Sequence, residues 1–309
     1  MKKLLSLLLA VGTLFIYSGC NEEEPVMRTG DRVPINFSGI QMLPTKVYGA
    51  SFIINDSIGI FMTDPGATLA ETTIKDKVSN YLYKAVATNV QALFTPAGQD
   101  TIYFPVGGSA AFIAYYPAVT SFATNYLIPI DIADQVPISL IPKLDILYSN
   151  NASSQIDANV SLVFKHVLSY INFYIEAGAG LTADELQSMS VQINNVATTA
   201  QFDLSKDTLT AMGSKTQNIP LPGQYYPSNN AANFEGIFLP GGNGSNSTVT
   251  FTLSNGKVFT YVIPATQLYL PGLYYSYYVN LNSTSASITG SVTPWGVGSL
   301  PDNGNIVVQ

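Results

Sequence analysis

The segment TVTFTLSNGKVFTYVIP, residues 248–264, restricts the fold more than any other part of the chain. Its first arm, Val249 to Leu253, alternates apolar and polar residues, a period of two that places the apolar side chains on one face of a strand. Asn255-Gly256 then supplies the residue pair that a tight hairpin turn with positive φ angles requires. The apolar stretch Val258 to Ile263 is the returning arm. The segment therefore predicts an antiparallel β-hairpin.

Comparable strand patterns recur at short intervals along the chain. We expect strands at residues 33–40, 57–62, 101–106, 110–117, 274–282 and 286–295, and one long strand or a bent pair at 160–175. Helix is scarce: Thr182 and Glu185 are spaced as a capping box at the start of TADELQSM, and a further helical turn is expected within residues 67–86. Many short strands between turn signals predict an all-β fold of packed sheets with very little helix.

The composition agrees with this fold class and argues against one class of partner, nucleic acid. Only 11% of the residues are charged, against about 25% in an ordinary globular protein, and tyrosine alone supplies 19 residues. Aromatic, β-branched and hydroxyl residues of this kind are typical of strands. The formal net charge is −7, so the chain lacks the basic surface that nucleic-acid binding needs. No nucleic acid is expected as a partner.

The N-terminus resembles the export signal of a bacterial lipoprotein. Lys2 and Lys3 precede the apolar run Leu4 to Ile16, which is too short for an ordinary membrane span and typical of a secretory signal. Ser18-Gly19 then stands directly before Cys20, the single cysteine of the chain. This resembles a lipobox, in which a peptidase cuts before the cysteine and the thiol receives lipid such as diacylglycerol and palmitate. We expect residues 1–19 to be the signal peptide, although a plain signal with an incidental Cys20 remains the alternative.

An acidic stretch follows the cysteine. Residues 20–32 include Glu22, Glu23 and Glu24, which resemble the label that directs some bacterial lipoproteins to the outer face of the cell. We expect this stretch to be a tether that holds the mature protein at the outer membrane through its lipid anchor. The expected location is therefore the cell surface.

The chain offers little for catalysis or metal binding. Its single histidine, His166, shares a strand face with apolar neighbours, so a structural role is favoured over a catalytic base. One histidine and the sequestered Cys20 do not make a zinc site. Carboxylates are sparse, although a two-carboxylate glycosidase remains open. We expect no catalytic residue, no metal, no cofactor and no enzyme activity. Trp295 ends an alternating apolar run and is expected in the core.

The domain organisation is inferred from one polar stretch. Residues 148–159, YSNNASSQIDAN, are rich in small and polar residues and lie between two strand-rich halves. We place a junction there, with an N-terminal domain at 33–154 and a C-terminal domain at 155–309.

Two segments carry a family resemblance. FPVGGSAAFIAYYP at 104–117 and LVFKH at 162–166 together are similar to fimbrillin-like proteins of Bacteroidales, and further strand segments follow in the same order between Ser57 and Trp295. The resemblance implies a lipoprotein precursor with two transthyretin-like β-sandwich domains that serves as a subunit of surface fimbriae. The expected partners are other fimbrial subunits and a processing protease.

The resemblance also implies an assembly mechanism. A protease removes the first strand, and the C-terminal segment of the next subunit fills the resulting groove by β-augmentation. The strand to be removed is 33–40, so the cut must follow it. Lys46 is the expected site, because Arg28 and Arg32, the other candidates, precede the strand.

The donor segment is expected at 299–309, where the apolar end Ile306, Val307 and Val308 alternates weakly. This end favours a stalk or tip subunit over an anchor. Ser57, Thr101 and Thr208 each follow an aspartate and precede an aliphatic residue, which resembles an O-glycosylation pattern, although such pairs also open strands and turns.

A second class of function remains open. The chain is alternatively a monomeric surface-anchored module that binds a glycan or a protein through exposed tyrosines or Trp295.

Overall fold

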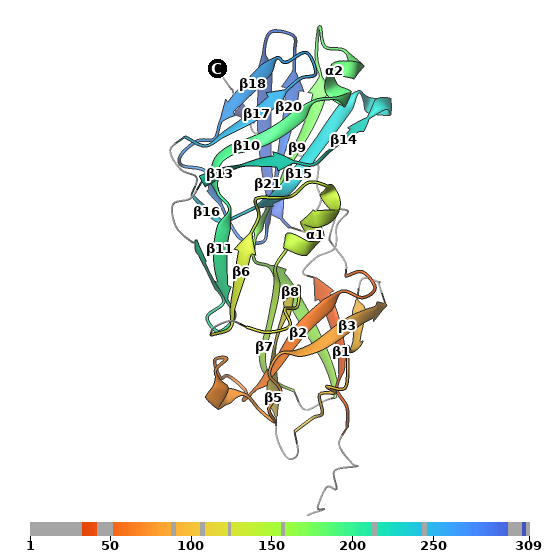
Figure 1. Cartoon of the computed structure of the whole chain (residues 1–309), viewed down its shortest axis with the longest axis vertical. Coiled ribbons are helices and arrows are strands. Elements are labelled where there is room, and N and C mark those ends of the chain that lie inside the picture. Colours follow the sequence, from red (N-terminus) through yellow and green to blue (C-terminus); the bar gives the residue numbers. More distant parts are fainter. Residues whose placement is uncertain are drawn as a thin grey trace, which may run out of the picture. The chain divides into compact units, whose positions relative to one another are not determined.

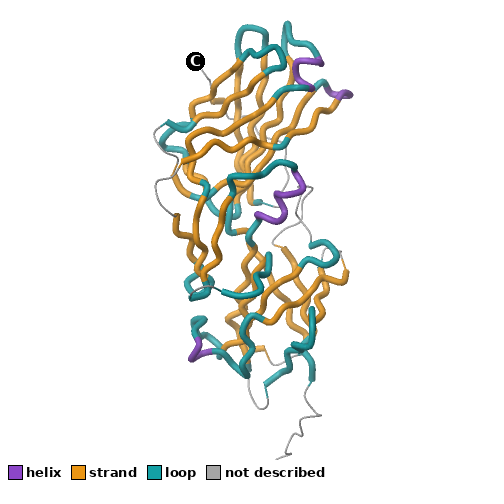
Figure 2. The backbone as a smooth tube through the Cα atoms, in the orientation of Figure 1, coloured by secondary structure: helices purple, strands orange, loops and turns teal. Residues whose placement is uncertain are grey.

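The computed structural model describes residues 33–41, 52–87, 91–105, 109–122, 125–155, 158–211, 216–242, 246–295 and 305–306. The chain separates into two compact units, 1–32 and 33–309, and the first lies outside the described residues. Within the second unit nearly all regular structure is strand, as Figures 1 and 2 show. The predicted all-β class with very little helix is confirmed. The transthyretin-like topology of two domains stays a prediction.

Seven strands of the N-terminal half close into a barrel in the order β1-β4-β3-β2-β5-β7-β8. Neighbouring strands are antiparallel except β1 and β8, which are parallel. The strands are β1 (Asn36–Gln41), β2 (Ser57–Thr63), β3 (Tyr81–Ala87), β4 (Ala92–Pro96), β5 (Ala110–Tyr116), β7 (Leu147–Gln155) and β8 (Asn159–His166).

Two larger sheets form the C-terminal half. The six-stranded sheet runs β14 (Gly223–Tyr226), β15 (Ala231–Phe238), β9 (Ser169–Ala177), β20 (Leu273–Leu281), β21 (Ala286–Pro294) and β22 (Asn305–Ile306). The four-stranded sheet runs β13 (Thr216–Leu221), β10 (Ser190–Ala197), β17 (Thr248–Thr252) and β18 (Val258–Val262). Their inner faces meet: the ring of Phe173 packs edge-on against Phe251 with centroids 5.6 Å apart. The two sheets therefore pack face to face.

Two small sheets and a few short helices complete the described structure. One sheet joins β6 (Leu127–Asp131), β11 (Thr199–Asp203) and β12 (Thr208–Ala211), and the other pairs β16 (Gly241–Gly242) with β19 (Leu268–Tyr269). The α-helices are α1 (Ile141–Leu144) and α2 (Ala183–Gln187), and the 3-10 turns are η1 (Glu71–Thr73), η2 (Ile138–Leu140) and η3 (Pro227–Asn229). Among the described helices, none is long and apolar enough to cross a membrane.

The buried apolar residues form two clusters. One fills the barrel and includes Phe37, Phe112 and Phe164. The other lies between the two larger sheets and extends to the outer face of the barrel, where Tyr148 packs edge-on against Phe202 of β11 with centroids 5.3 Å apart. The β6-β11-β12 sheet thus joins strands from both halves of the sequence over one side of the barrel.

The predicted junction at 148–159, with its boundary between 154 and 155, is wrong in position. Most of this stretch belongs to β7 and the start of β8, which are adjacent strands of the same barrel. Pairing with β5 satisfies the backbone of β7, so small polar side chains do not prevent a strand there. We propose instead that the halves divide between His166 and Ser169, where β8 passes into β9. The strand expected at 101–106 is reduced to one isolated bridge between Pro34 and Tyr103.

Candidate strand-exchange site

The first strand of the barrel has the alternation expected of a strand with one face in the core. Ile35, Phe37 and Gly39 are buried, whereas Asn36 is exposed and Ser38 is half-buried. The prediction of a half-buried strand here is confirmed. The inward residues belong to β1 or directly precede it, so the interior of the barrel depends on this strand.

Phe37 is the main apolar contribution of β1. Its ring is 2% exposed and packs edge-on between Tyr83, at a centroid distance of 5.2 Å, and Phe112, at 5.3 Å. Burial of an aromatic or branched apolar side chain contributes about 1.5–3 kcal/mol to stability. Burial also raises the pKa of Tyr83 to about 12, and the Tyr83 hydroxyl accepts a hydrogen bond of 2.8 Å from the Ile102 amide.

Gly39 marks the closest approach between β1 and its neighbours. A Cβ atom at this position would lie 2.6 Å from the ring of Phe94 and 3.0 Å from that of Phe164. Real Cβ atoms essentially never come as close as 2.6 Å, and 3.0 Å is tighter than most, so the two phenylalanines occupy the space that a side chain would need. Glycine is therefore the residue that fits at position 39 without displacing these rings.

The backbone of β1 pairs on both sides. It runs parallel to β8, with Phe37 opposite Val160, and antiparallel to β4, with Phe37 opposite Phe94. Beyond the strand itself, the Ile35 amide donates to the Ile102 carbonyl at 2.9 Å. Removal of β1 would therefore open the barrel between β4 and β8, leaving two unpaired strand edges and an apolar interior in contact with water.

The other processing and lipidation residues predicted from the sequence lie outside the described residues. These are Cys20, Arg28, Arg32, Lys46, Val307 and Val308. Lys46 falls in the sequence between Gln41, the end of β1, and Phe52, the next described residue. Of the predicted donor segment, Asn305–Ile306 forms β22, which pairs antiparallel with Thr289 and Ile288 of β21.

The three predicted glycosylation residues lie on separate elements. Ser57 opens β2, is half-buried, and its hydroxyl donates to the Asn55 carbonyl at 3.4 Å. Thr101 is half-buried in the stretch between β4 and β5, and Thr208 opens β12 and is exposed. Modification of these residues stays a prediction, and Thr208 is the most accessible of the three.

His166 lies in the core, as its apolar neighbours indicated. Its Nδ1 atom is 2.9 Å from one carboxylate oxygen of Asp145 and 3.0 Å from the other, and both side chains are buried. Trp295 is also buried and stacks on the imidazole ring, which confirms its predicted place in the core. Asp145 was missed by the sequence analysis, because no local pattern links it to a histidine 21 residues away.

The described residues contain no group of three or more histidine, cysteine, aspartate or glutamate side chains placed to hold a metal ion. The candidate site is therefore defined by the pairing of β1 with its neighbouring strands and by the packing of its apolar side chains.

Solved structures of candidate bacterial cell adhesion proteins share this fold. A candidate cell adhesion protein of Bacteroides uniformis superposes with a TM-score of 0.71 at 24% identity, covering 87% of this chain and all of the other. One from Bacteroides ovatus gives a TM-score of 0.66 at 18% identity, covering 87% of this chain and 99% of the other. The fold is thus that of a β-rich class to which these candidate bacterial cell adhesion proteins belong.

Sequence comparison defines the family within that class. The model of the fimbrillin-like family matches residues 45–295. A candidate fimbrium subunit of Bacteroides uniformis, Fim1C, is 28% identical over 313 residues, which cover 97% of this chain and 96% of that protein. The chain belongs to the fimbrillin-like family, as its segments at 104–117 and 162–166 indicated.

Proposed function

We propose that the protein is a stalk or tip subunit of cell-surface fimbriae and assembles by exchange of β1 for a strand of another subunit. The observation that carries this proposal is the position of β1, the strand that closes the barrel and inserts Phe37 into its interior. Membership of the fimbrillin-like family supports it, and so does the likeness to a fimbrium subunit over nearly the whole chain.

The trigger is a cut in the chain after β1. After cleavage at Lys46, β1 is attached to the rest of the barrel by noncovalent contacts alone, chiefly its pairing with β4 and β8 and its buried side chains. Cleavage at Arg28 or Arg32 leaves β1 covalently attached to the barrel, because both residues precede it. Lys46 is therefore the processing site that the topology favours.

The replacement strand is the C-terminal segment 299–309 of the next subunit. Ile306 and Val308 are spaced by two residues, as are the buried Ile35, which directly precedes β1, and Phe37 and Gly39 within it. A strand with this spacing presents its apolar side chains to the barrel while its backbone pairs with the exposed edges. Because β22 pairs with β21 of its own chain, donation exchanges that pairing for one in the neighbouring barrel.

Delivery to the surface precedes assembly. Lipidation of Cys20 and the acidic tether at 20–32 hold the precursor at the outer membrane, with the signal at 1–19 removed. A cut at Lys46 then releases the lipid anchor together with β1, so the lipidated residue delivers the subunit and is absent from the fibre.

Limited proteolysis tests the proposal. The purified protein is incubated with trypsin and examined on a denaturing gel for a ladder of stable multimers. We expect the ladder with the natural chain and with Lys143→Gln, a matched change of an exposed lysine in α1, but not with Lys46→Gln. A chain that lacks residues 300–309 should be clipped and remain monomeric. A ladder formed by Lys46→Gln, or a clipped natural chain that stays monomeric, would contradict strand exchange.

A further inference from the structure

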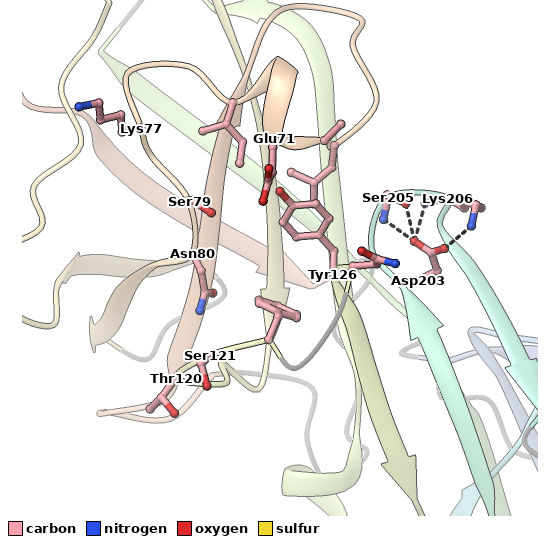
Figure 3. A pocket seen from close by; sticks show the side chains of 15 residues that line it. Glu71, Lys77, Ser79, Asn80, Thr120, Ser121, Tyr126, Asp203, Ser205 and Lys206 are labelled. Carbon is pink, nitrogen blue, oxygen red and sulfur yellow. Dashed lines mark hydrogen bonds and ion pairs between the residues drawn. The ribbon is translucent and has the colours of Figure 1, made fainter.

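A groove of about 1100 Å³ lies where three loops meet beside the barrel. It is lined by the stretch around η1, by residues 120–122 and 125–126 between β5 and β6, and by the turn between β11 and β12 (Figure 3). None of the lining residues belongs to β1 or to the C-terminal segment, so the groove is separate from the strand-exchange site. Its volume exceeds the roughly 300–1,000 Å³ of pockets that hold one small molecule.

Aromatic rings form part of the groove wall. Phe122 and Tyr126 both line it, are half-buried, and pack against the buried ring of Phe61 with centroid distances of 5.8 and 5.4 Å. Phe122 also meets Tyr115 at 5.6 Å. The rings are held from behind by the core, so they present a preorganised apolar surface that costs little conformational entropy to use.

Polar side chains surround these rings. Glu71, Ser79, Thr120, Ser121 and Asn125 line the groove and are exposed. Among the described residues, no hydrogen-bond partner is found for the side chains of Glu71, Thr120 and Ser121. In Figure 3 the Glu71 carboxylate lies beside the Tyr126 ring. These carboxylate, hydroxyl and amide groups are therefore available as donors and acceptors to a ligand.

The charges of the groove balance. The Lys206 ammonium pairs with Asp203 at 2.7 Å, and the same carboxylate accepts bonds from the backbone and hydroxyl of Ser205 (Figure 3). Glu71 and Lys77 are the remaining acid and base of the lining. A groove without net charge does not favour an anionic ligand. Its walls are loops and turns apart from Asp203 at the end of β11, so it offers little strand edge for an extended peptide.

We propose that this groove binds a neutral oligosaccharide. Sugar rings carry an apolar face that packs on aromatic side chains and a periphery of hydroxyl groups that exchange hydrogen bonds with carboxylate, amide and hydroxyl groups. The groove presents both surfaces side by side, Phe122 and Tyr126 for the ring face and Glu71, Thr120 and Ser121 for the hydroxyls. Its volume of about 1100 Å³ leaves room for more than one sugar unit. The ligand class goes beyond the structural role in a fibre and does not depend on strand exchange.

Saturation-transfer NMR and calorimetry test the proposal on the purified, uncleaved protein. The probes are maltohexaose, mannohexaose, cellohexaose and a hexasaccharide of N-acetyllactosamine, with a heparin hexasaccharide as the anionic comparator. We expect at least one neutral probe to bind, and Glu71→Ala to weaken that binding about tenfold or more, the effect of losing a hydrogen bond to a charged group. Ser121→Ala should weaken it by a smaller factor.

Control variants outside the groove separate a loss of binding from a loss of folding. Asp134→Ala removes an exposed acid outside the groove, and Tyr226→Phe alters an exposed tyrosine on β14, so both should bind as the natural protein does. Tyr126→Phe keeps the packed ring and tests its hydroxyl alone. The proposal is overturned if no neutral probe binds at millimolar concentration, if only heparin binds, or if Glu71→Ala and Ser121→Ala bind as tightly as the natural protein. Polymerisation in the trypsin assay should be unchanged in every groove variant.

Discussion

The imidazole ring of His166 stacks on the indole ring of Trp295, with centroids 3.8 Å apart and ring planes inclined by only 10°. His166 ends β8 of the barrel, whereas Trp295 directly follows β21 of the six-stranded sheet. The Asp145 carboxylate lies 2.9 Å from Nδ1 at the edge of the imidazole, and the Trp295 amide donates to the Gly272 carbonyl at 2.7 Å. The stack therefore packs the residue that follows β21 against the end of β8 in the barrel.

Loss of this indole should destabilise the whole described fold. Replacing Trp295 by alanine removes a buried aromatic side chain and leaves a cavity beside His166, so we expect the free energy of unfolding to fall by about 3–5 kcal/mol. Urea denaturation followed by circular dichroism measures the change. Tyr226→Ala, at a side chain that is 37% exposed, should change the same quantity by less than about 1 kcal/mol. Equal effects of the two substitutions would contradict the core role of Trp295.

Removal of the carboxylate partner should also cost stability. Asp145→Ala leaves the buried Nδ1 of His166 without its partner, and an unsatisfied buried polar group costs about 1–3 kcal/mol. Asp145→Asn retains an oxygen acceptor and should cost less. The comparison uses the same denaturation measurement, with the exposed Asp134→Ala as the control. If Asp145→Asn and Asp145→Ala destabilise equally, the hydrogen bond is not what Asp145 contributes.

Two glycine-to-alanine substitutions should change the free energy of unfolding in opposite directions. Gly39→Ala forces a Cβ atom to within 2.6 Å of Phe94, so repacking of the barrel should lower the free energy of unfolding by about 1–3 kcal/mol. Gly98→Ala meets no atom within 4 Å and has no left-handed φ, so it should raise stability by about 0.4–1 kcal/mol through the unfolded state. Thermal unfolding of both variants checks the pair. A neutral Gly39→Ala would show that β1 does not pack closely in the barrel.

The buried carboxyl of Glu235 should make the free energy of unfolding depend on pH. Burial raises the pKa of Glu235 above its ordinary value, even though the Asn233 side chain donates to it at 3.3 Å. Because the pKa is higher in the folded state, the protonated carboxyl stabilises the fold. This contribution to the free energy of unfolding is fully present below the unfolded pKa of about 4.3 and is lost as the pH rises through the folded pKa. Glu235→Gln stays neutral and avoids this loss, so its stability relative to the natural protein should be higher at pH 7 than at pH 4.

Urea midpoints of both proteins at the two pH values measure this difference. Asp134→Asn, at an exposed acid, should show no comparable change. A stability difference for Glu235→Gln that is the same at pH 4 and pH 7 would show that the carboxyl does not titrate differently on folding.

Local features were predictable because neighbouring residues determine them. The hairpin expected at 248–264 is present as β17 and β18, with Thr248 opposite Val262 and Gly256 at a φ of 84°. The capping box is also present: the Thr182 hydroxyl accepts from the Glu185 amide at 3.3 Å, and the Thr182 amide donates to the Glu185 carboxylate at 2.8 Å. In both cases the controlling contacts span a few residues.

Features that depend on distant pairing were not predictable. The alternation of residues in β1 identified a strand, but it did not show that this strand lies between β4 and β8. In the pairing with β8, Asn36 lies opposite Asn159, which is far away in the sequence. The polar residues of β7 suggested a linker, because the hydrogen bonds that make them a strand come from β5. The loops of the oligosaccharide groove meet only after folding, so no sequence pattern indicated them.

The first residue of the assembled subunit tests strand exchange most directly. Multimers formed after proteolysis are isolated, denatured and subjected to N-terminal sequencing, with the non-assembled fraction sequenced in parallel. We expect the assembled subunits to begin at Val47 and to lack β1. Assembled subunits that begin at Thr29 or Val33, and so retain β1, would contradict it.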